Sequence, residues 1–194
     1  KYRVLQLDDR VVERANPKIA GRPDLMDGRT SLTLDDGMTG MSANVFINIK
    51  NRSHTITAEV EIPAAGANGA VLVQGGRFGG WAPYFKDGKP SYTYNFLGMQ
   101  SFTVSAPQAL AAGKATVTID FVYDGGGMGK GGTATLTVNG TKAADVKIPM
   151  TQAIVFSADE TADGGIDDGT PVVERVGHGK PSRFTGKINK VTVT

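Results

Sequence analysis

Apolar and polar residues alternate along several short stretches of the chain, which is the pattern of β-strands that bury one face. In residues 53–62 every second residue from Ile56 to Ile62 is apolar, the residues between them are threonine or glutamate, and Pro63 follows. Proline cannot donate a hydrogen bond to a neighbouring strand and therefore ends the pairing. The longest alternation covers residues 115–123 and predicts a central strand. The pattern indicates an all-β protein.

Two pairs of strands are joined by dipeptides that favour tight turns. Residues 75–95 predict one β-hairpin, in which Asp87-Gly88 separates an aromatic-rich run from an alternating one. Residues 132–148 predict a second hairpin that turns at Asn139-Gly140. Two-residue hairpin turns need positive φ angles, which these dipeptides tolerate. The hairpins therefore predict an antiparallel arrangement.

Shorter runs predict further strands and the loops between them. The additional strands are expected in residues 30–34, 44–49, 69–74, 152–157 and 183–194, the last with a bulge near Asn189. The glycine-rich residues 124–132 and the acidic residues 158–170 predict loops. About a dozen strands at this spacing predict a two-sheet antiparallel jelly-roll sandwich, because one open sheet of that width would curl or split.

Residues 1–29 lack a sustained period of either kind and are interrupted at Asn16-Pro17 and Gly21-Arg22-Pro23. We expect an extended lead-in that packs on a β-sandwich domain of residues 30–194, with its arginines paired to acidic loops. A solvated linker is the alternative. The chain begins at Lys1 without an initiator methionine or a signal-like apolar core. We therefore expect it to be part of a longer polypeptide.

Composition and charge narrow the classes of function. The 194 residues suffice for one well-cored domain, and the 26 glycines suit many short strands joined by tight turns. A formal net charge of +2 gives no dense basic field, so we expect no nucleic-acid partner. The absence of cysteine excludes disulfides, thiolate nucleophiles and cysteine-ligated zinc. No apolar run reaches the roughly 18–20 residues of a membrane span, and the compartment, periplasm or cytoplasm, stays open.

Two glutamates, Glu59 and Glu61, share the polar face of one predicted strand and lie about 6.6 Å apart from the strand rise alone. This separation is near the range that glycoside hydrolases use, and the pair half resembles the carboxylate strand of jelly-roll glucanases. The third carboxylate of that motif is missing, because Pro63 and Ala64 occupy its place. A solvated strand face is therefore the favoured interpretation.

Acidic residues gather between positions 158 and 170, where glycines also make the chain flexible. Carboxylate oxygens on such a loop suit calcium, although the spacing does not match an EF-hand. The alternatives are arginine partners such as Arg175 and Arg183, or hydration, since unpaired carboxylates repel one another. The candidate ligands of a structural calcium ion are Asp159, Asp163, Asp167 and Asp168.

The aromatic-rich hairpin and two basic residues supply candidates for sugar binding. Aromatic rings can bury the apolar C–H faces of saccharides, and basic groups bind sulfate. In a sandwich such rings usually fill the core, and strand parity places Trp81 and Tyr84 on opposite faces. Core packing is therefore the favoured interpretation. The candidate binding residues are Arg77, Trp81, Tyr84 and Lys130.

Two other patterns lack the features of a reactive site. Gly129-Lys130 is followed by Gly131, so the phosphate-loop motif is not met. His54 and His178 are far apart in the sequence and have no cysteine to complete a metal set. We therefore assign catalysis to neither.

An ordered series of motifs runs through nearly the whole chain. The motifs are Gly21-Arg22-Pro23, Asn51-Arg52-Ser53-His54, Gly75-Gly76-Arg77-Phe78-Gly79-Gly80-Trp81, Lys86-Asp87-Gly88-Lys89, Tyr94-Asn95, Gly129-Lys130-Gly131-Gly132 and Phe184-Thr185-Gly186-Lys187-Ile188. In this order they resemble the C-terminal region of large bacterial arylsulfatases. The resemblance implies a jelly-roll sandwich of the concanavalin A-like or laminin-G-like type. In the full protein it would follow an α/β sulfatase domain that holds a formylglycine and a divalent metal.

The sulfatase nucleophile has no counterpart here. The nearest match to its motif is Gly179-Lys180-Pro181-Ser182-Arg183, in which glycine stands where the motif needs cysteine or serine. The resemblance therefore implies a non-catalytic, cofactor-free accessory domain that packs on the sulfatase domain of the same chain and shapes its substrate cleft. The alternative is a carbohydrate-binding module for sulfated glycans. An independent jelly-roll hydrolase that uses Glu59 is the least favoured hypothesis.

Overall fold

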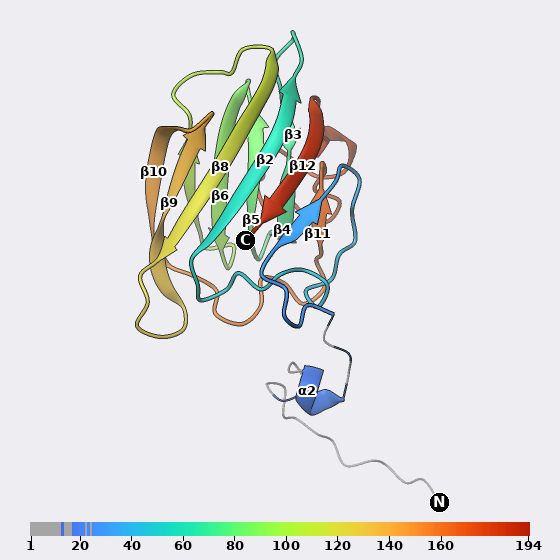
Figure 1. Ribbon diagram of the computed structural model, residues 1–194, viewed down its shortest axis with the longest axis vertical. Helices are drawn as coiled ribbons and strands as arrows, with labels where there is room; N and C mark the ends of the chain where they lie inside the picture. Colours follow the sequence, from blue (N-terminus) through green and yellow to red (C-terminus); the bar gives the residue numbers. More distant parts are fainter. Residues whose placement is uncertain (1–12, 14–16, 22, 24) are drawn as a thin grey trace, which may run out of the picture.

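The body of the structure is built from strands, with two short helical turns among the described elements (Figure 1). The computed structural model describes residues 13, 17–21, 23 and 25–194. In chain order the elements are α2 (Pro17–Ala20), β1 (Leu32–Leu34), β2 (His54–Ile62), β3 (Gly69–Ala70), β4 (Leu72–Gly76), β5 (Gly79–Lys86), β6 (Lys89–Phe96), β7 (Gln100–Ser105), β8 (Gly113–Tyr123), β9 (Lys130–Val138), β10 (Thr141–Met150), β11 (Ala162–Gly164), the 3-10 helix η1 (Lys180–Ser182) and β12 (Lys187–Val193).

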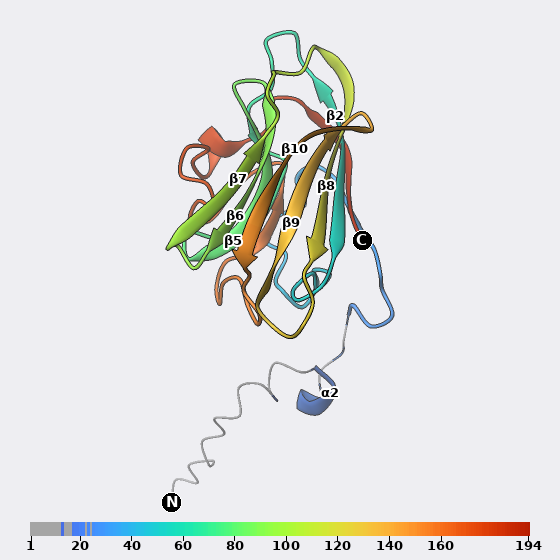
Figure 2. The ribbon, with the colours of Figure 1, turned by 90° about the vertical axis from the view of Figure 1, so that its left-hand side faces the viewer.

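The strands form two antiparallel sheets that pack face to face. The first sheet has the order β1-β12-β2-β8-β9-β10, and the second has the order β11-β4-β5-β6-β7, with β3 paired to β5. Figure 2 shows β5, β6 and β7 in one layer and β8, β9 and β2 in the other. The predicted two-sheet antiparallel sandwich is confirmed.

Both predicted hairpins are present, with the expected turns. β5 and β6 pair up to Lys86 and Lys89, and the turn residues Asp87 and Gly88 have φ angles of 52° and 73°. β9 and β10 meet at Asn139 and Gly140, whose φ angles are 48° and 79°. These left-handed conformations match the twist of the adjoining strands. The turn sequences therefore set both hairpin registers.

Side chains from both sheets meet in one apolar core between the layers. On β2 the predicted alternation is confirmed, because the apolar residues from Ile56 to Ile62 are buried. β8 pairs with β2 on one side and with β9 on the other, as expected for a central strand. Trp81 is fully buried in this core, and its ring centroid lies 6.0 Å from that of Phe46.

Two of the predicted strands are wrong, because the residues form irregular segments. Residues 44–49 make a turn followed by an extended piece without strand pairing. Three of its side chains are buried against the core: Phe46, Ile47 and Ile49. Residues 152–157 are also irregular, because the Gln152 amide donates hydrogen bonds to the backbone oxygens of Val155 (3.0 Å) and Phe156 (3.1 Å). Apolar runs that cover the core as loops resemble strands in sequence.

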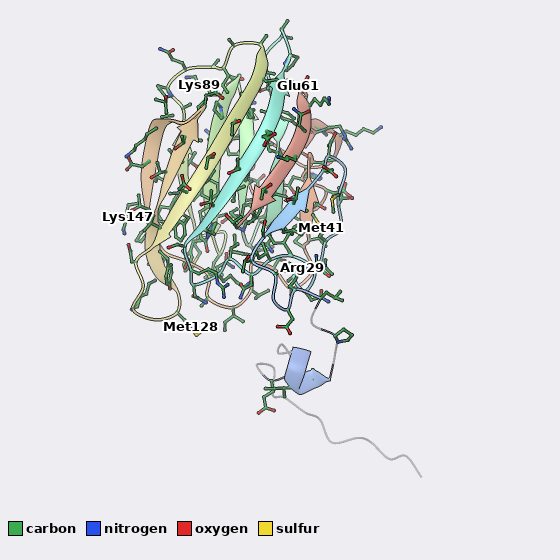
Figure 3. The ribbon with its side chains drawn as sticks, in the orientation of Figure 1. Arg29, Met41, Glu61, Lys89, Met128 and Lys147 are labelled. Atoms are coloured by element: carbon green, nitrogen blue, oxygen red, sulfur yellow. The ribbon has the colours of Figure 1, made fainter. Side chains whose placement is uncertain are left out.

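The predicted glycine-rich loop is shorter than expected. Residues 130–132 belong to β9, so the connection from β8 covers residues 124–129 only. A Cβ atom on Gly132 would lie 2.3 Å from Cζ of Phe121, so the lack of a side chain lets the adjacent strand carry a large ring there. Figure 3 shows Met128, in this connection, and Lys89, after the β5–β6 turn, at opposite ends of the sandwich.

The predicted acidic loop of residues 158–170 is interrupted by β11, which pairs with β4 in the second sheet. Asp163 on β11 is buried, as is Asp167 beyond it. The predicted bulge near Asn189 is confirmed, because the pairing of β12 with β2 shifts register between Ile188 and Lys190.

The predicted lead-in of residues 1–29 lies largely outside the described residues. Its described part includes α2 and the partly buried Met26, which packs against the core. The division into this lead-in and a domain of residues 30–194 stays a prediction. Within the described ranges, no helix has the length and apolar character that crossing a bilayer would require.

Shortening a core side chain should destabilise the sandwich. Leu136 is fully buried, so Leu136→Ala should lower the free energy of unfolding by about 2–5 kcal/mol through lost burial and a residual cavity. Urea denaturation followed by the fluorescence of Trp81, the single tryptophan, measures this change. Val122→Ala on β8 is the control, because the Val122 side chain is exposed and its loss should cost less than about 0.5 kcal/mol. Equal effects of both substitutions would contradict the described core.

Candidate functional site

A segment that follows β11 covers part of the outer face of the second sheet. This segment, residues 166–183, is called the cover segment. Its Val172 and Val173 pack against Ala82 and Tyr84 in a small apolar cluster separate from the main core. Figure 2 shows the segment, in orange-red, on the outer side of the layer formed by β5, β6 and β7. β5 and β6 are consequently buried on both faces.

The two ends of the cover segment are tied together at Asp167 and Ser182. The Ser182 hydroxyl accepts a hydrogen bond from the backbone N–H of Asp167 (2.9 Å) and donates one to the backbone oxygen of Gly179 (2.7 Å). The Asp167 carboxyl accepts a hydrogen bond from the backbone N–H of Val172 at 2.9 Å through Oδ2. These contacts turn the chain back and hold Val172 against the sheet.

The carboxyl of Asp167 is buried and has one oxygen without a partner. Its Oδ1 atom forms no hydrogen bond within the described part of the chain. Burial raises the pKa of this carboxyl from 3.8 to about 7, although the Val172 N–H opposes the change. The nearby carboxyls of Asp163, Glu160 and Asp168 raise the pKa further. Asp167 therefore keeps its proton up to near-neutral pH.

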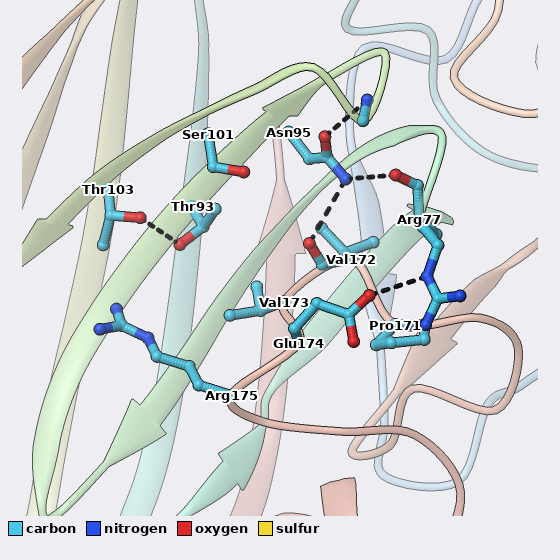
Figure 4. A pocket seen from close by; sticks show the side chains of 11 residues that line it. Arg77, Thr93, Asn95, Ser101, Thr103, Pro171, Val172, Val173, Glu174 and Arg175 are labelled. Atoms are coloured by element: carbon cyan, nitrogen blue, oxygen red, sulfur yellow. Dashed lines mark hydrogen bonds and ion pairs between the residues drawn. The ribbon is translucent and has the colours of Figure 1, made fainter.

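A pocket of about 340 Å³ lies beside the cover segment, over the outer face of β6 and β7 (Figure 4). Its floor consists of side chains that point outward from these two strands, and its wall is the stretch from Pro171 to Arg175. The lining residues are Arg77, Thr93, Asn95, Gly98, Ser101, Thr103, Pro171, Val172, Val173, Glu174 and Arg175. The pocket therefore combines a hydroxyl-rich floor with a charged wall.

Asn95 joins the three chain segments that frame the pocket. Its amide nitrogen donates hydrogen bonds to the backbone oxygens of Gly76 (3.3 Å) and Arg77 (2.8 Å) in the β4–β5 turn, and lies 3.5 Å from that of Val172. Its amide oxygen accepts a hydrogen bond from the N–H of Gly98 (2.9 Å) in the β6–β7 turn. Both ends of the Asn95 amide have partners, so Asn95 serves as a structural clamp.

The charged side chains of the pocket differ in how far they are neutralised. Arg77 forms an ion pair with Glu174, with 2.8 Å between Nε and Oε1. Arg175 lies over the ring of Tyr84, with 5.3 Å from guanidinium carbon to ring centroid, and donates a hydrogen bond to the Tyr84 hydroxyl. No carboxylate pairs with Arg175 among the described residues. The lining therefore carries one uncompensated positive charge, on the exposed Arg175.

The structure brings together only part of the predicted binding set. Arg77 lines the pocket, and Tyr84 lies buried beneath Arg175. Trp81 faces the core, where its indole N–H donates to Gln74, so in this structure its ring offers no face to a sugar. Lys130 is exposed at the start of β9 in the other sheet and does not join Arg77.

Sequence reasoning missed most of the pocket. Arg175 entered only as one alternative partner of the acidic loop. Glu174 and the threonines of β6 and β7 carried no assignment. The alternation of Thr93 with its tyrosine neighbours on β6 was the available signal, because it places the threonine on the outer face. The hydroxyls of Thr93 and Thr103 lie 2.8 Å apart across the two strands.

Three of the predicted calcium ligands accept hydrogen bonds from protein groups, Asp167 as described above and Asp159 and Asp163 as follows. Asp163 accepts hydrogen bonds from the N–H of Gly40 (2.8 Å) and the hydroxyl of Thr161 (3.3 Å), and Asp159 accepts one from Ser157 (3.1 Å). In the parts of the chain that the structure describes, no group of three or more histidine and acidic side chains could hold a metal ion. Calcium binding stays an untested prediction.

The other titratable candidates are held by ordinary structural contacts. Glu59 and Glu61 pair across the first sheet with Lys190 (3.0 Å) and Lys187 (3.5 Å), which fits the solvated strand face favoured above. His54 stacks on Phe121 with 5.1 Å between ring centroids, and burial lowers its pKa to about 4. Neither arrangement resembles a catalytic centre.

Comparisons with known proteins identify a fold. No family model matches the chain, and no curated protein matches it. The CBM40 of the Ruminococcus gnavus IT-sialidase, bound to α2,3-sialyllactose, is similar with a TM-score of 0.52 and 14% sequence identity, over 84% of this chain and 88% of that chain. Domains LG4-5 of the mouse laminin α1 chain are similar with a TM-score of 0.50 and 15% identity, over 84% of this chain and 38% of that chain.

At these identities the likeness shows the fold alone. The chain shares the two-sheet β-sandwich fold of these laminin-G and CBM40 domains. The comparisons show no arylsulfatase parent. The resemblance to the C-terminal region of arylsulfatases therefore stays a prediction from the sequence motifs.

Replacing Asp167 by a side chain that cannot ionise should remove part of the pH dependence of stability. The folded state keeps the Asp167 proton up to about pH 7, whereas the unfolded chain releases it near pH 3.8. The free energy of unfolding therefore falls as the pH rises through this window. At about 1.4 kcal/mol per pKa unit, the full effect is about 4 kcal/mol. Asparagine still accepts from Val172, so Asp167→Asn should become progressively more stable than wild type up to neutral pH.

Urea denaturation at several pH values from about 4 to 8 measures this difference. Asp159→Asn is the matched control, because Asp159 is exposed. Its free energy of unfolding should depend on pH as that of the wild type does. An Asp167→Asn variant that stays no more stable than wild type at pH 8 would show that the carboxyl is not held buried and unpaired.

Proposed function

We propose that this domain is a binding module that holds a saccharide in the pocket on the second sheet, with an anionic group of the ligand on Arg175. The single observation that supports this most is the Arg175 guanidinium. It is exposed at the pocket wall, makes one hydrogen bond among the described residues and faces no carboxylate. An arginine in this state offers two parallel N–H donors to a sulfate ester or a carboxylate.

The floor of the pocket suits the neutral part of such a ligand. Thr93 on β6 is buried, and its hydroxyl lies 2.8 Å from that of Thr103, whereas Ser101 and Thr103 on β7 are exposed and present their hydroxyls to the pocket (Figure 4). A hydroxyl can donate and accept, as a sugar hydroxyl does, so these groups can exchange hydrogen bonds with several sugar orientations. The Arg77–Glu174 pair adds a donor and an acceptor on the opposite side.

The structural comparisons are in keeping with a saccharide ligand and do not specify one. The Ruminococcus gnavus domain was solved with α2,3-sialyllactose and with α2,6-sialyllactose. That ligand belongs to that protein, and only the fold is shared. The chemistry of the ligand proposed here depends on Arg175 and the hydroxyls.

The role of an accessory domain in an arylsulfatase has support from the sequence motifs alone. A sulfated-glycan module and such a parent enzyme are compatible, because both handle sulfate esters. The proposal for this chain concerns binding and includes no reaction.

Substitution of Arg175 tests the proposal. In an array of neutral, carboxylated and sulfated glycans, the wild-type chain should bind members with an anionic group, and added salt should weaken this binding. For the best ligand, Arg175→Ala should reduce the affinity roughly tenfold to a hundredfold, because a hydrogen bond to a charged group is lost. Arg175→Lys keeps the charge but loses the pair of parallel N–H donors, so its affinity should lie between those of the wild type and Arg175→Ala.

Lys130→Ala is the matched control, because Lys130 is also exposed but lies on the other sheet. It should bind as wild type does. Isothermal titration calorimetry provides the affinities. Equal binding of neutral and anionic glycans, or an unchanged affinity in Arg175→Ala, would refute the proposal.

A further inference from the structure

One aromatic ring stands apart from the others in its exposure. Among the aromatic side chains that the structure describes, Phe78 alone belongs to the large exposed apolar residues, with 72% of its surface accessible. The rings that the sequence offered as a sugar platform, including Trp81 and Tyr84, are buried. An exposed Phe does little for the fold, because its burial contributes almost nothing to stability.

Phe78 lies directly beside the pocket. It follows Arg77 in the β4–β5 turn, and a Cβ atom placed on Gly98 would lie 3.5 Å from Cδ1 of Phe78. Arg77 and Gly98 both line the pocket, and the Asn95 clamp binds the backbone of both turns. The backbone of the turn that carries Phe78 is therefore fixed beside the pocket by the same Asn95 contacts that shape it.

The neighbouring turn adds two exposed apolar side chains. Leu97 and Met99 are 44% and 70% accessible, and they flank Gly98 in the β6–β7 turn. Leu97 has a φ angle of 54°, a left-handed conformation that is uncommon for a residue other than glycine, asparagine or aspartate. Gly98 follows with a φ angle of 70°, and the N–H of Met99 donates a hydrogen bond to the backbone oxygen of Phe96 (3.0 Å), so this conformation belongs to a tight hairpin turn. The turn leaves the side chains of Leu97 and Met99 in solvent.

The volume of the pocket limits what it can enclose. About 340 Å³ is near the lower end of the roughly 300–1,000 Å³ typical of small-molecule sites. A ligand longer than the pocket must pass over the rim. At the turns next to Arg77 and Gly98 that rim is the apolar surface of Phe78, Leu97 and Met99.

We infer that Phe78, supported by Leu97 and Met99, forms a second subsite that stacks against the next sugar ring of an oligosaccharide whose anionic residue occupies the pocket. The inference rests on the proposed function. Pyranose rings present an apolar C–H face, which an aromatic face buries while the sugar hydroxyls stay in water. The domain accordingly prefers oligosaccharides to single sugars, and Arg175 and Phe78 contribute to different parts of the ligand.

Chain-length dependence of binding tests this division. Two matched pairs serve as ligands for the full 194-residue chain: N-acetylneuraminic acid with 3′-sialyllactose, and the disaccharide with the tetrasaccharide of chondroitin 4-sulfate. For the pair that binds, the longer member should bind the wild type roughly threefold to tenfold more tightly. Phe78→Ala should abolish this gain and leave the affinity of the shorter member unchanged. Phe78→Trp should keep the gain.

Two controls separate the subsite from general effects. Val122→Ala removes an exposed apolar side chain from the first sheet and should leave the gain intact. The melting temperature of Phe78→Ala should equal that of wild type, because the ring is exposed. Sedimentation should show the same oligomeric state for both, and a dimer that Phe78→Ala dissociates would assign the surface to a second copy of the chain and overturn the inference.

The outcomes also separate the two proposals. The second subsite alone is overturned if an anionic ligand binds through Arg175 but its affinity does not rise with length. It is also overturned if the gain in affinity survives in Phe78→Ala. Failure of the wild type to bind any of the four ligands or any anionic glycan of the array overturns the proposed function and the inference with it. A gain in affinity with ligand length that requires Phe78 supports the proposed function and the second subsite.

Discussion

The hydrogen bond from the backbone N–H of Val172 to the buried carboxyl of Asp167 determines how the cover segment meets the second sheet. Because this bond turns the chain back, Val172 and Val173 reach the apolar side chains on the outer face of β5. Without that contact the outer face would be a hydrophobic surface in water. The interaction therefore decides both the burial of the sheet and the position of the pocket wall.

The cover segment divides the outer face into an apolar half and a polar half. Over β4 and β5 the outward side chains are aliphatic or aromatic, and the valines of the cover segment pack against them. Over β6 and β7 the side chains that line the pocket are threonine, serine and asparagine. Thr93 and Asn95 are buried and hydrogen-bonded, whereas Ser101 and Thr103 are exposed. The boundary between the halves is where Arg175 lies over Tyr84. The outward-facing side chains of the second sheet therefore determine both where the cover segment packs and where the pocket lies.

Much of the fold could be predicted from local sequence, whereas the site could not. Alternation and turn dipeptides identify β2, β8 and both hairpins, because these signals act over a few residues. Residues 44–49 were misassigned, since a buried apolar loop and a buried strand look alike without an alternating partner. The pocket combines the turns near Arg77 and Gly98 with the distant Arg175, and only tertiary packing brings them together. The alternation of side chains along a strand places Trp81 and Tyr84 on opposite faces. It could not show that Phe78, in the turn, is the exposed ring.

The wall of the pocket belongs to a segment with its own internal anchor, while the floor belongs to the hairpins. Changes of sequence at Glu174 and Arg175 therefore need not disturb strand pairing, provided that Asp167 and Ser182 keep their contacts and that Val172 and Val173 stay on the sheet. Such an arrangement separates recognition from stability, so related domains could diverge in what they bind while sharing the same sheets. It also makes this loop a natural place to graft new specificity onto the scaffold.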